Sequence, residues 1–278
     1  MMQLIEPGRR LWTPRDVDAP LVEPHVFAPP PPPFGAGGTL SIANVKWQGW
    51  NPGLLAGLVL WLRGDSIVRD PTDLSKVSSW NDKSVNAHNT AVALITQRPT
   101  YSAAAINGKP GATFDGALTF LRSFGTNTMP ALANLSVWVV AKPTATAAGI
   151  QYGMIGFGAF TPAFGTYGNN PFYTHSSPFA FNSWTDKTVV AGTSYLFEYK
   201  RGAGPAWNML LNGGLSTLTY TTAFTTTPLN WGYGDEGPGS SPHVFLGDIC
   251  EIVVIDHAAT ALEESNMHTY SQSYYATA

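Results

Sequence analysis

The chain has 278 residues, of which 44% are hydrophobic and 12% are charged, and its formal net charge is −3. The charged share is about half the ~25% of an average domain, and the slight negative charge gives no electrostatic reason to expect nucleic-acid binding. The single cysteine, Cys250, excludes a disulfide framework and a cysteine-rich zinc site, and we expect a buried, inert thiol.

The N-terminal part of the chain shows no secretion or membrane signal. Residues 1–12 lack the apolar core of a signal peptide. The longest apolar run, Leu54–Leu62, has nine residues, whereas about 20 are needed to span a bilayer. We therefore expect a protein that is not inserted in a membrane and does not use the general secretory route.

Prolines concentrate near the N-terminus. Nine of the 22 lie in residues 1–40, and five of them form the run Pro29–Pro33. Because proline fixes φ and lacks an N–H group, this stretch cannot form a helix or a central strand, and the run favours polyproline II. Three glycines within residues 35–38 then predict a flexible joint.

Large apolar side chains lie in this Pro-rich stretch, among them Leu11, Trp12, Phe27 and Phe34. Two interpretations are open. A Pro-rich terminus is often a disordered tail, but such tails are usually poor in large apolar residues. We therefore predict that residues 1–50 form an extended anchoring arm, which docks through these side chains on its own subunits or on a larger assembly.

The body, residues 51–278, alternates short β-branched and aromatic runs with clusters of Gly, Asn, Ser and Pro, which is typical of an all-β sandwich. The stretch Leu135–Lys142 is nearly continuous in apolar residues and suits a central strand. The predicted strands are Leu58–Leu62, Gly111–Phe114, Leu118–Arg122, Leu135–Lys142, Tyr152–Phe157, Tyr195–Arg201, Trp207–Leu211, Leu218–Thr221 and Val244–Asp256.

Two local patterns are more specific. Asn212-Gly213 between two apolar runs predicts a tight hairpin turn. Thr260 and Glu263 have the spacing of a capping box, which predicts a helix that begins there. The aromatic and apolar residues at helical spacing, which we interpret as packing against the sheet rather than as a binding site, are Met267, Tyr270 and Tyr274.

Four segments in order form a further pattern: Gly57–Asp65, Val77–Asn89, Arg98–Gly116 with its Asn-Gly-Lys-Pro and Phe-Asp-Gly passages, and Phe245–Asp256 before the closing helix. Together they resemble the concanavalin A-like lectin/glucanase superfamily, in its bacterial and phage laminin-G-like branch. The resemblance covers about residues 54–276. Its middle matches only in texture, and the first fifty residues do not match.

The resemblance implies an all-β fold, a two-sheet antiparallel jelly-roll sandwich with one C-terminal helix, to which the chain adds its extended Pro-rich N-terminal arm. Members of this superfamily mostly bind glycans or other proteins, or act as structural modules, and a minority are glycosidases or lyases. Because a fold alone does not determine which of these functions a protein has, the function has to be argued from individual residues.

Carboxyl groups that could act in catalysis are scarce. A glycosidase needs two of them flanking the scissile bond, and outside the arm and the last helix only three glutamates remain, Glu198, Glu236 and Glu251. Asp248 and Glu251 differ by three positions, so they point to opposite faces of a regular strand and cannot pair without a bulge. Nothing matches the glutamate–aspartate–glutamate cluster of the superfamily's glucanases, and we predict no catalytic residues and no enzyme activity.

The six histidines show no zinc-ligand spacing. Some relatives in the superfamily bind Ca²⁺ through loop oxygens, and on that basis Asp65, Asp82, Asn86 and Asp115 are the candidate Ca²⁺ ligands. The alternative is that these side chains hold turns through hydrogen bonds. We expect no other cofactor.

Two stretches, Gly165–His175 and Asn230–Glu236, combine aromatic residues with Asn and Asp. Sugars suit such a composition, because their C–H faces stack on rings while amides and carboxylates take the hydroxyls. The alternative is that large loops use the same residues to hold themselves. The candidate ligand-binding residues are Tyr167, Asn169, Asn170, Trp231, Tyr233, Asp235 and Glu236.

The combination of an anchoring arm and a lectin-like body predicts a surface protein of a phage virion. It would be a head or tail appendage that is made in the host cytoplasm. The arm would join other virion proteins, and the body would bind host surface glycan as a homo-oligomer, by analogy a trimer. Two alternatives remain: a purely structural capsid decoration or cement protein without ligand, and a polysaccharide-degrading enzyme of the same fold, which the missing carboxylate cluster disfavours.

Overall fold

The structure is a computed structural model, and the residues it describes are 50–92, 94–122, 134–147, 151–157, 163–174, 181–204, 206–221, 231–233 and 245–278. All of them belong to one unit of the chain, Lys46–Ala278. The four anchor residues Leu11, Trp12, Phe27 and Phe34 lie outside this part, so the anchoring arm stays a prediction. No helix of the described part is both long and apolar enough to cross a membrane.

The described residues form seventeen strands, two short 3-10 helices and one α-helix. The helices are η2 (Pro52–Leu54), η3 (Ile95–Gln97) and α1 (Ala261–Tyr275). The strands are β1 (Leu58–Arg69), β2 (Val77–Asp82), β3 (Thr90–Ala91), β4 (Thr100–Ile106), β5 (Lys109–Asp115), β6 (Leu121–Arg122), β7 (Leu135–Pro143), β8 (Gln151–Phe157), β9 (Ala163–Tyr167), β10 (Asn170–Thr174), β11 (Phe181–Ser183), β12 (Tyr195–Arg201), β13 (Ala206–Leu211), β14 (Gly214–Leu215), β15 (Tyr220–Thr221), β16 (Trp231–Tyr233) and β17 (Leu246–Ile255).

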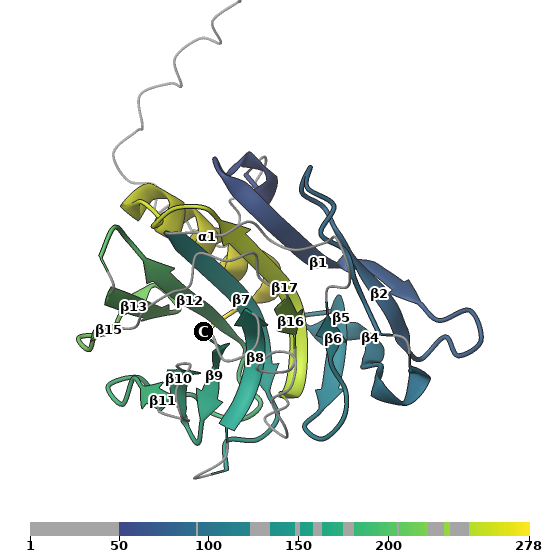
Figure 1. Cartoon of the computed structure of the whole chain (residues 1–278). Coiled ribbons are helices and arrows are strands. Elements are labelled where there is room, and N and C mark those ends of the chain that lie inside the picture. Colours follow the sequence, from purple (N-terminus) through teal and green to yellow (C-terminus); the bar gives the residue numbers. More distant parts are fainter. Residues whose placement is uncertain are drawn as a thin grey trace, which may run out of the picture. The chain divides into compact units, whose positions relative to one another are not determined.

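The strands pair antiparallel and form two layers (Figure 1). One layer, the helix-side sheet, runs β13–β12–β7–β17, and both β1 and β5 pair with the far edge of β17. The second sheet runs β2–β3–β6–β16–β8–β9–β10–β11. Strand β1 joins the layers, because it pairs with β17 along its first half and with β2 up to its end.

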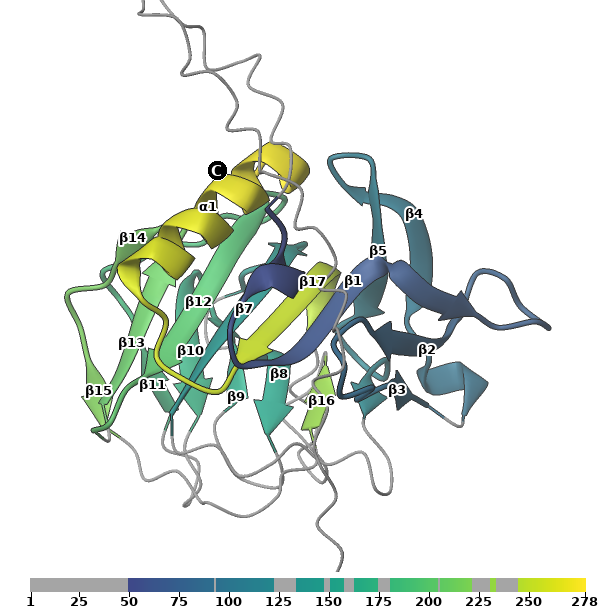
Figure 2. The same cartoon turned by 90° about the horizontal axis from the view of Figure 1, so that it is seen from above.

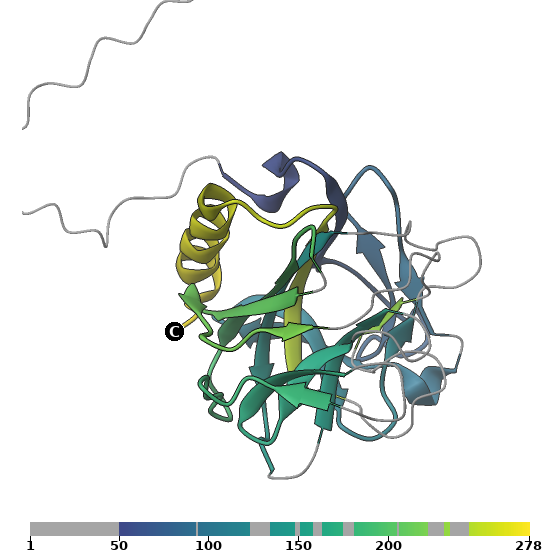
Figure 3. The same cartoon turned by 60° about the vertical axis from the view of Figure 1, so that its left-hand side comes forward.

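The main core lies between the two sheets, and a second core lies between the helix-side sheet and α1. Strand β7 serves both: Val137 and Val139 point into the main core, whereas Trp138 and Val140 point toward α1. Both faces of this strand are therefore covered, which explains its nearly continuous apolar sequence. Figures 2 and 3 show α1 lying against the outer face of the helix-side sheet.

The predicted all-β antiparallel sandwich with one C-terminal helix is confirmed. Each of the nine predicted strands overlaps an observed one, and Tyr195–Arg201 has the predicted bounds. The strand predicted at Leu118–Arg122 is shorter, because Asp115 Oδ1 accepts the N–H groups of residues 117–119 and holds a turn there.

The predicted Asn212-Gly213 hairpin is also confirmed. Asn212 and Gly213 have φ angles of 50° and 76°, and a two-residue type I′ turn requires positive φ at both positions. The flanking residues Leu211 and Gly214 pair across the hairpin. The returning strand, β14, has only two residues.

Helix α1 begins at the predicted capping box. The Thr260 hydroxyl accepts the Glu263 N–H at 3.3 Å, and the Glu263 carboxylate accepts the Thr260 N–H at 2.8 Å. The helix ends at Tyr275, and the C-cap residue Ala276 has left-handed geometry (φ 52°). The residues of α1 that are buried against the sheet are Met267, Tyr270, Ser271 and Tyr275. The packing interpretation is therefore confirmed for Met267 and Tyr270, and Tyr274 is half-buried.

We predict that Thr260→Ala lowers the free energy of unfolding by about 1 kcal/mol, since it removes one half of the capping box. Urea unfolding followed by circular dichroism measures the change. Thr269→Ala is the matched control: Thr269 lies within α1 and donates only to the Ser265 carbonyl, so its loss is expected to change stability by less than about 0.5 kcal/mol. Equal effects of the two substitutions would contradict the capping role.

Candidate functional site

Strand β1 places three polar or aromatic side chains beside α1. Because side chains alternate along a strand, Leu60 and Leu62 enter the main core while Trp61, Arg63 and Asp65 share the opposite face. Trp61 is 8% exposed, and Asp65 is exposed. Because these residues occupy every second position of β1, the Trp61 indole, the Arg63 guanidinium and the Asp65 carboxylate lie in a row on one face of the strand.

A glycine brings the β4–β5 hairpin next to this row. A Cβ at Gly64 would overlap the Pro110 carbonyl group, so only glycine allows β1 and β5 to approach this closely. The hairpin turns at Asn107 and Gly108, both with positive φ, and the Asn107 side chain donates to the Tyr274 carbonyl at 3.3 Å. Lys109 is thereby held against the C-terminal turn of α1.

Strand β17 contributes Glu251 through a bulge. Its register against β7 shifts between Ile249, which pairs with Ala141, and Glu251, which pairs with Val140, so Cys250 is an extra residue. The bulge turns Cys250 and Glu251 to the same side, toward α1, while Ile249 stays in the main core. The predicted alternation of a regular strand is wrong here.

Asp248 is also on the outer side of β17. It pairs with Lys142 at 2.8 Å and accepts the Thr113 hydroxyl at 2.5 Å. Asp248 and Glu251 could share one face only if the strand contained a bulge, and the structure has that bulge. The two carboxyl groups nevertheless have separate partners, since Glu251 is bonded to β1 and α1.

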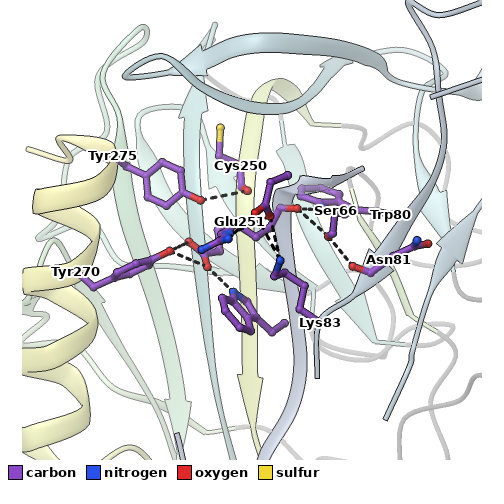
Figure 4. Close-up of polar contacts among 11 residues, drawn as sticks. Ser66, Trp80, Asn81, Lys83, Cys250, Glu251, Tyr270 and Tyr275 are labelled. Atoms are coloured by element: carbon purple, nitrogen blue, oxygen red, sulfur yellow. Dashed lines mark hydrogen bonds and ion pairs between the residues drawn. The ribbon is translucent and has the colours of Figure 1, made fainter. Parts of the chain in front are cut away.

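Glu251 is the centre of a buried hydrogen-bond network (Figure 4). The Trp61 indole Nε1–H donates to it at 2.5 Å and the Tyr270 hydroxyl at 3.0 Å. Glu251 is 1% exposed, and this burial raises the pKa of its carboxyl group to about 7, although both hydrogen bonds act in the opposite direction. Arg63, its cross-strand neighbour, also favours the charged form.

The surface above Glu251 is a row of rings and cations, which we call the cation–aromatic ladder: Lys83, Trp61, Arg63, Tyr274 and Lys109. Lys83 Nζ lies 5.5 Å from the Trp61 ring centroid, and Arg63 Cζ lies 5.3 Å from the same ring. Arg63 Cζ is also 5.6 Å from the Tyr274 centroid, and Lys109 Nζ is 4.2 Å from it. All of these distances lie within the range of cation–π attraction.

One exposed carboxylate, Asp65, neutralises part of the ladder. It forms two hydrogen bonds with the Arg63 guanidinium, and this ion pair lowers the pKa of Asp65 and raises that of Arg63. Lys83 Nζ lies 3.4 Å from the same carboxylate. No described carboxylate lies within ion-pair distance of Lys109.

A second buried carboxyl group, Glu198, lies under α1. It is 3% exposed, and its Oε2 accepts the Trp138 indole N–H at 2.7 Å. Burial, together with repulsion by Glu264, raises the pKa of Glu198 to about 8. Its Oε1 has no hydrogen-bond partner among the described residues, and the nearby Lys200 forms its ion pair with Glu264 instead.

The candidate Ca²⁺ ligands Asp65, Asp82, Asn86 and Asp115 each hold local structure. Asp82 accepts the N–H groups of Trp61 and Ser84 at 2.9 and 2.8 Å. Asn86 donates to strand β1 at the Val59 carbonyl. The turn bonds of Asp115 lower its pKa to about 2, although partial burial opposes them.

The structure does not gather these four residues, because they are distributed over β1, the end of β2, the following loop and β5. Within the described part of the chain, no group of three or more His, Cys, Asp or Glu side chains is placed to hold a metal ion. Ca²⁺ binding stays an untested prediction.

The stretches interpreted as ligand-binding loops contain strands. Residues 163–174 form the β9–β10 hairpin, whose turn lies at Gly168 and Asn169, and Trp231–Tyr233 is β16. The loop interpretation is wrong for these residues, since both segments pair along β8. Asp235 and Glu236 lie outside the described residues.

The two candidate groups are in register with opposite ends of β8. Gln151, its first residue, pairs with Tyr167, and Phe157, its last, pairs with Trp231. Six residues of strand separate these positions by roughly 20 Å. The hairpin tip, with Tyr167, Asn169 and Asn170, is therefore not beside Trp231.

Comparison with known proteins identifies the fold of the chain through solved structures rather than through sequence. No known sequence family matches the chain, and no curated protein sequence does. Solved structures do match: domain 4 of AbnA, a GH43 extracellular arabinanase from Geobacillus stearothermophilus in complex with arabinotriose, has a TM-score of 0.54 at 17% identity. That match covers 77% of this chain and 98% of the domain.

Other matches are larger proteins. The receptor-binding domain of botulinum neurotoxin type G has a TM-score of 0.52 at 11% identity, covering 78% of this chain and 52% of that one. Trypanosoma rangeli sialidase in complex with sialic acid has a TM-score of 0.54 at 12% identity, with 80% and 34% covered. The chain spans about half of the toxin domain and a third of the sialidase. These likenesses establish a lectin-like β-sandwich fold.

Sequence reasoning missed the cation–aromatic ladder. Arg63 and Asp65, two positions apart on a strand, were a usable signal for a surface ion pair. The approach of Lys109 and Tyr274 could not be read from the sequence, because the β4–β5 hairpin and α1 are far apart in the chain and meet only in the fold, where Asn107 donates to the Tyr274 carbonyl.

The raised pKa values of Glu198 and Glu251 predict the pH dependence of stability. Their ordinary value is 4.5, so the folded protein binds more protons than the unfolded chain above that pH. Their stabilising contribution is complete below about pH 4.5 and is lost as pH rises through about 7 for Glu251 and about 8 for Glu198.

Glu198→Gln, a neutral mimic of the protonated side chain, is expected to match the wild type near pH 5 and to be more stable near pH 9, as measured by urea unfolding. Asp73→Asn is the control. Hydrogen bonds from the Ser75 hydroxyl and N–H lower the pKa of the Asp73 carboxyl below its ordinary 3.8, so Asp73 is ionised throughout this range and the slope is expected to stay that of the wild type. A Glu198→Gln curve parallel to the wild type would contradict the assignment.

Proposed function

We propose that this chain is a glycan-binding protein of the concanavalin A-like type. The observation that carries this proposal is the match to the arabinanase domain, which was solved with arabinotriose and of which this chain covers 98%. The four sequence segments from Gly57 to Asp256 that resemble the superfamily support the same assignment. For uncharged sugars, we propose a site at β16 on the basis of its sequence, which contains two aromatic residues of the kind that stack on sugars, Trp231 and Tyr233.

We further propose that the protein is a surface component of a phage virion. The Pro-rich residues 1–50, with Trp12 and Phe27 among their apolar side chains, would anchor it to capsid or tail proteins. The lectin-like domain would then face outward toward host glycans as part of a homo-oligomer. A structural decoration role without ligand is the alternative that a binding experiment distinguishes.

The carboxyl groups support a role without catalysis. A glycosidase acid and its partner must both reach the sugar, whereas Glu198 and Glu251 are 3% and 1% exposed. Each is also held by a tryptophan indole. Release of reducing sugar from a capsular polysaccharide would overturn this part of the proposal.

Trp231→Ala together with Tyr233→Ala is expected to abolish binding of neutral oligosaccharides on a glycan array, because both stacking rings are lost. The matched control is Trp50→Ala, which removes a half-buried aromatic ring that packs against Tyr270 beside α1 and is expected to leave neutral-sugar binding unchanged. Binding that persists in the double variant would reject β16 as the site, and a wild-type protein that binds no neutral glycan would reject the proposed function there.

Deletion of residues 1–40 is expected to abolish incorporation into particles while leaving the sandwich folded, since all described residues lie in the unit that begins at Lys46. Incorporation is measured by blotting purified particles, and folding by circular dichroism of the isolated truncated protein. Normal incorporation of the truncated protein would show that the arm is not the anchor.

A further inference from the structure

The cation–aromatic ladder has more positive than negative groups. Three cations, Arg63, Lys83 and Lys109, face one exposed carboxylate, Asp65. Asp65 forms a bidentate pair with Arg63, and Lys83 makes only a longer contact with the same carboxylate, at 3.4 Å. Lys109 has no carboxylate within reach in the described part of the chain. This local excess of positive charge stands out on a chain whose net charge is −3.

Aromatic rings flank all three cations, and Asp65 additionally pairs with two of them, Arg63 and Lys83. Each cation lies between 4.2 and 5.6 Å from a ring centroid. A cation over a ring face keeps N–H groups for other acceptors, because the ring takes none of them as a conventional hydrogen bond. The two lysines therefore retain donors for an incoming anion.

Three elements fix the ladder before any ligand arrives. Trp61 is anchored from below by its hydrogen bond to Glu251, and Tyr274 is tied to the β4–β5 hairpin through Asn107. The contact at Gly64 holds β1 against the same hairpin. A site that is already ordered loses less conformational entropy on binding.

We propose that the cation–aromatic ladder binds the carboxylate groups of an acidic saccharide, such as a glycan containing uronic or sialic acid. The inference rests on the proposed function only in taking the partner to be a glycan. Lys83 and Lys109 contact different rings of the ladder, Trp61 and Tyr274, so a glycan with more than one acidic sugar offers a carboxylate to each lysine. Nucleic acid fits less well, because cations already cover the ring faces on which bases would stack.

The test measures binding of fluorescent uronic-acid oligomers to the full chain by anisotropy, with neutral oligomers of equal length and a single-stranded oligonucleotide as comparison probes. We expect the acidic oligomers to bind and Lys83→Gln with Lys109→Gln to weaken that binding about tenfold or more, since the weakly paired Lys83 and the unpaired Lys109 both lose their charge. Raising salt from about 0.05 to 0.5 M should weaken them as well. The control is Lys76→Gln, which lies away from the ladder and whose Nζ contacts the Arg98 carbonyl.

The outcomes separate this inference from the proposed function. Loss in the lysine variant, with no loss in Lys76→Gln or in the Trp231/Tyr233 double variant, supports the ladder. Acidic oligomers that bind the lysine variant as tightly as the wild type overturn it, as does equal binding of the oligonucleotide. If acidic oligomers fail to bind while neutral ones do, the ladder is rejected and the glycan-binding function stands.

A second experiment locates the bound oligomer on the wild-type protein. In NMR spectra, the indole N–H signal of Trp61 is expected to shift on titration with the acidic oligomer, whereas that of Trp207, buried in the main core, is expected to stay fixed. A shift of Trp207 without a shift of Trp61 would overturn the proposed location.

Discussion

The arrangement on the outer side of the sandwich depends on the single extra residue in β17. Without the bulge at Cys250, Glu251 would follow the alternation of Ile249 and point into the main core, where its carboxyl group would have no hydrogen-bond partner. With the bulge, it faces Trp61 and Tyr270, which satisfy it. The core keeps its apolar composition because Ile252 resumes the inward pattern.

A buried carboxyl group is costly, and an apolar side chain of similar size often serves stability as well or better. What Glu251 adds is a fixed position for α1. An apolar helix face can slide along an apolar sheet with little change in buried area, but the Tyr270 hydroxyl reaches Glu251 in one register only. Glu198 and Trp138 repeat the pairing of a carboxyl with an indole two strands away. Of the two, only the Glu251 network reaches the helix, and its Tyr270 hydrogen bond specifies how the helix lies on the sheet.

The sequence was sufficient for the fold class and for the features that depend on local chemistry. The capping box at Thr260, the Asn212-Gly213 turn and the central strand around Val139 follow from a few neighbouring residues. Strand β2 was not predicted, because its polar residues do not alternate with apolar ones in a simple way. The β9–β10 hairpin was taken for a loop, since Gly and Asn at its turn dominate its composition.

The candidate site was less predictable for a physical reason. The bulge at Cys250 leaves no mark in composition: Asp248 to Glu251 reads as a regular strand, and only pairing with β7 reveals the extra residue. Likewise, Lys109 and Arg63 reach the same Tyr274 ring, and the close approach of β1 to β5 beside them requires a residue without a side chain at Gly64. Contacts of this kind depend on backbone approach between distant segments, which one sequence does not display.

The scarcity of charge gives the ladder its significance. On an average surface, with about twice as many charged residues, three cations would be neutralised by nearby carboxylates and screened by their neighbours. Here only 33 of 278 residues are charged, and the carboxyl groups of Glu198 and Glu251 are buried beneath α1 and the ladder rather than on the surface. Burial also favours their neutral forms, so below about pH 7 they compensate little of the positive charge above them. The same burial therefore leaves the ladder with a positive excess on its outer side, which Asp65 alone does not balance.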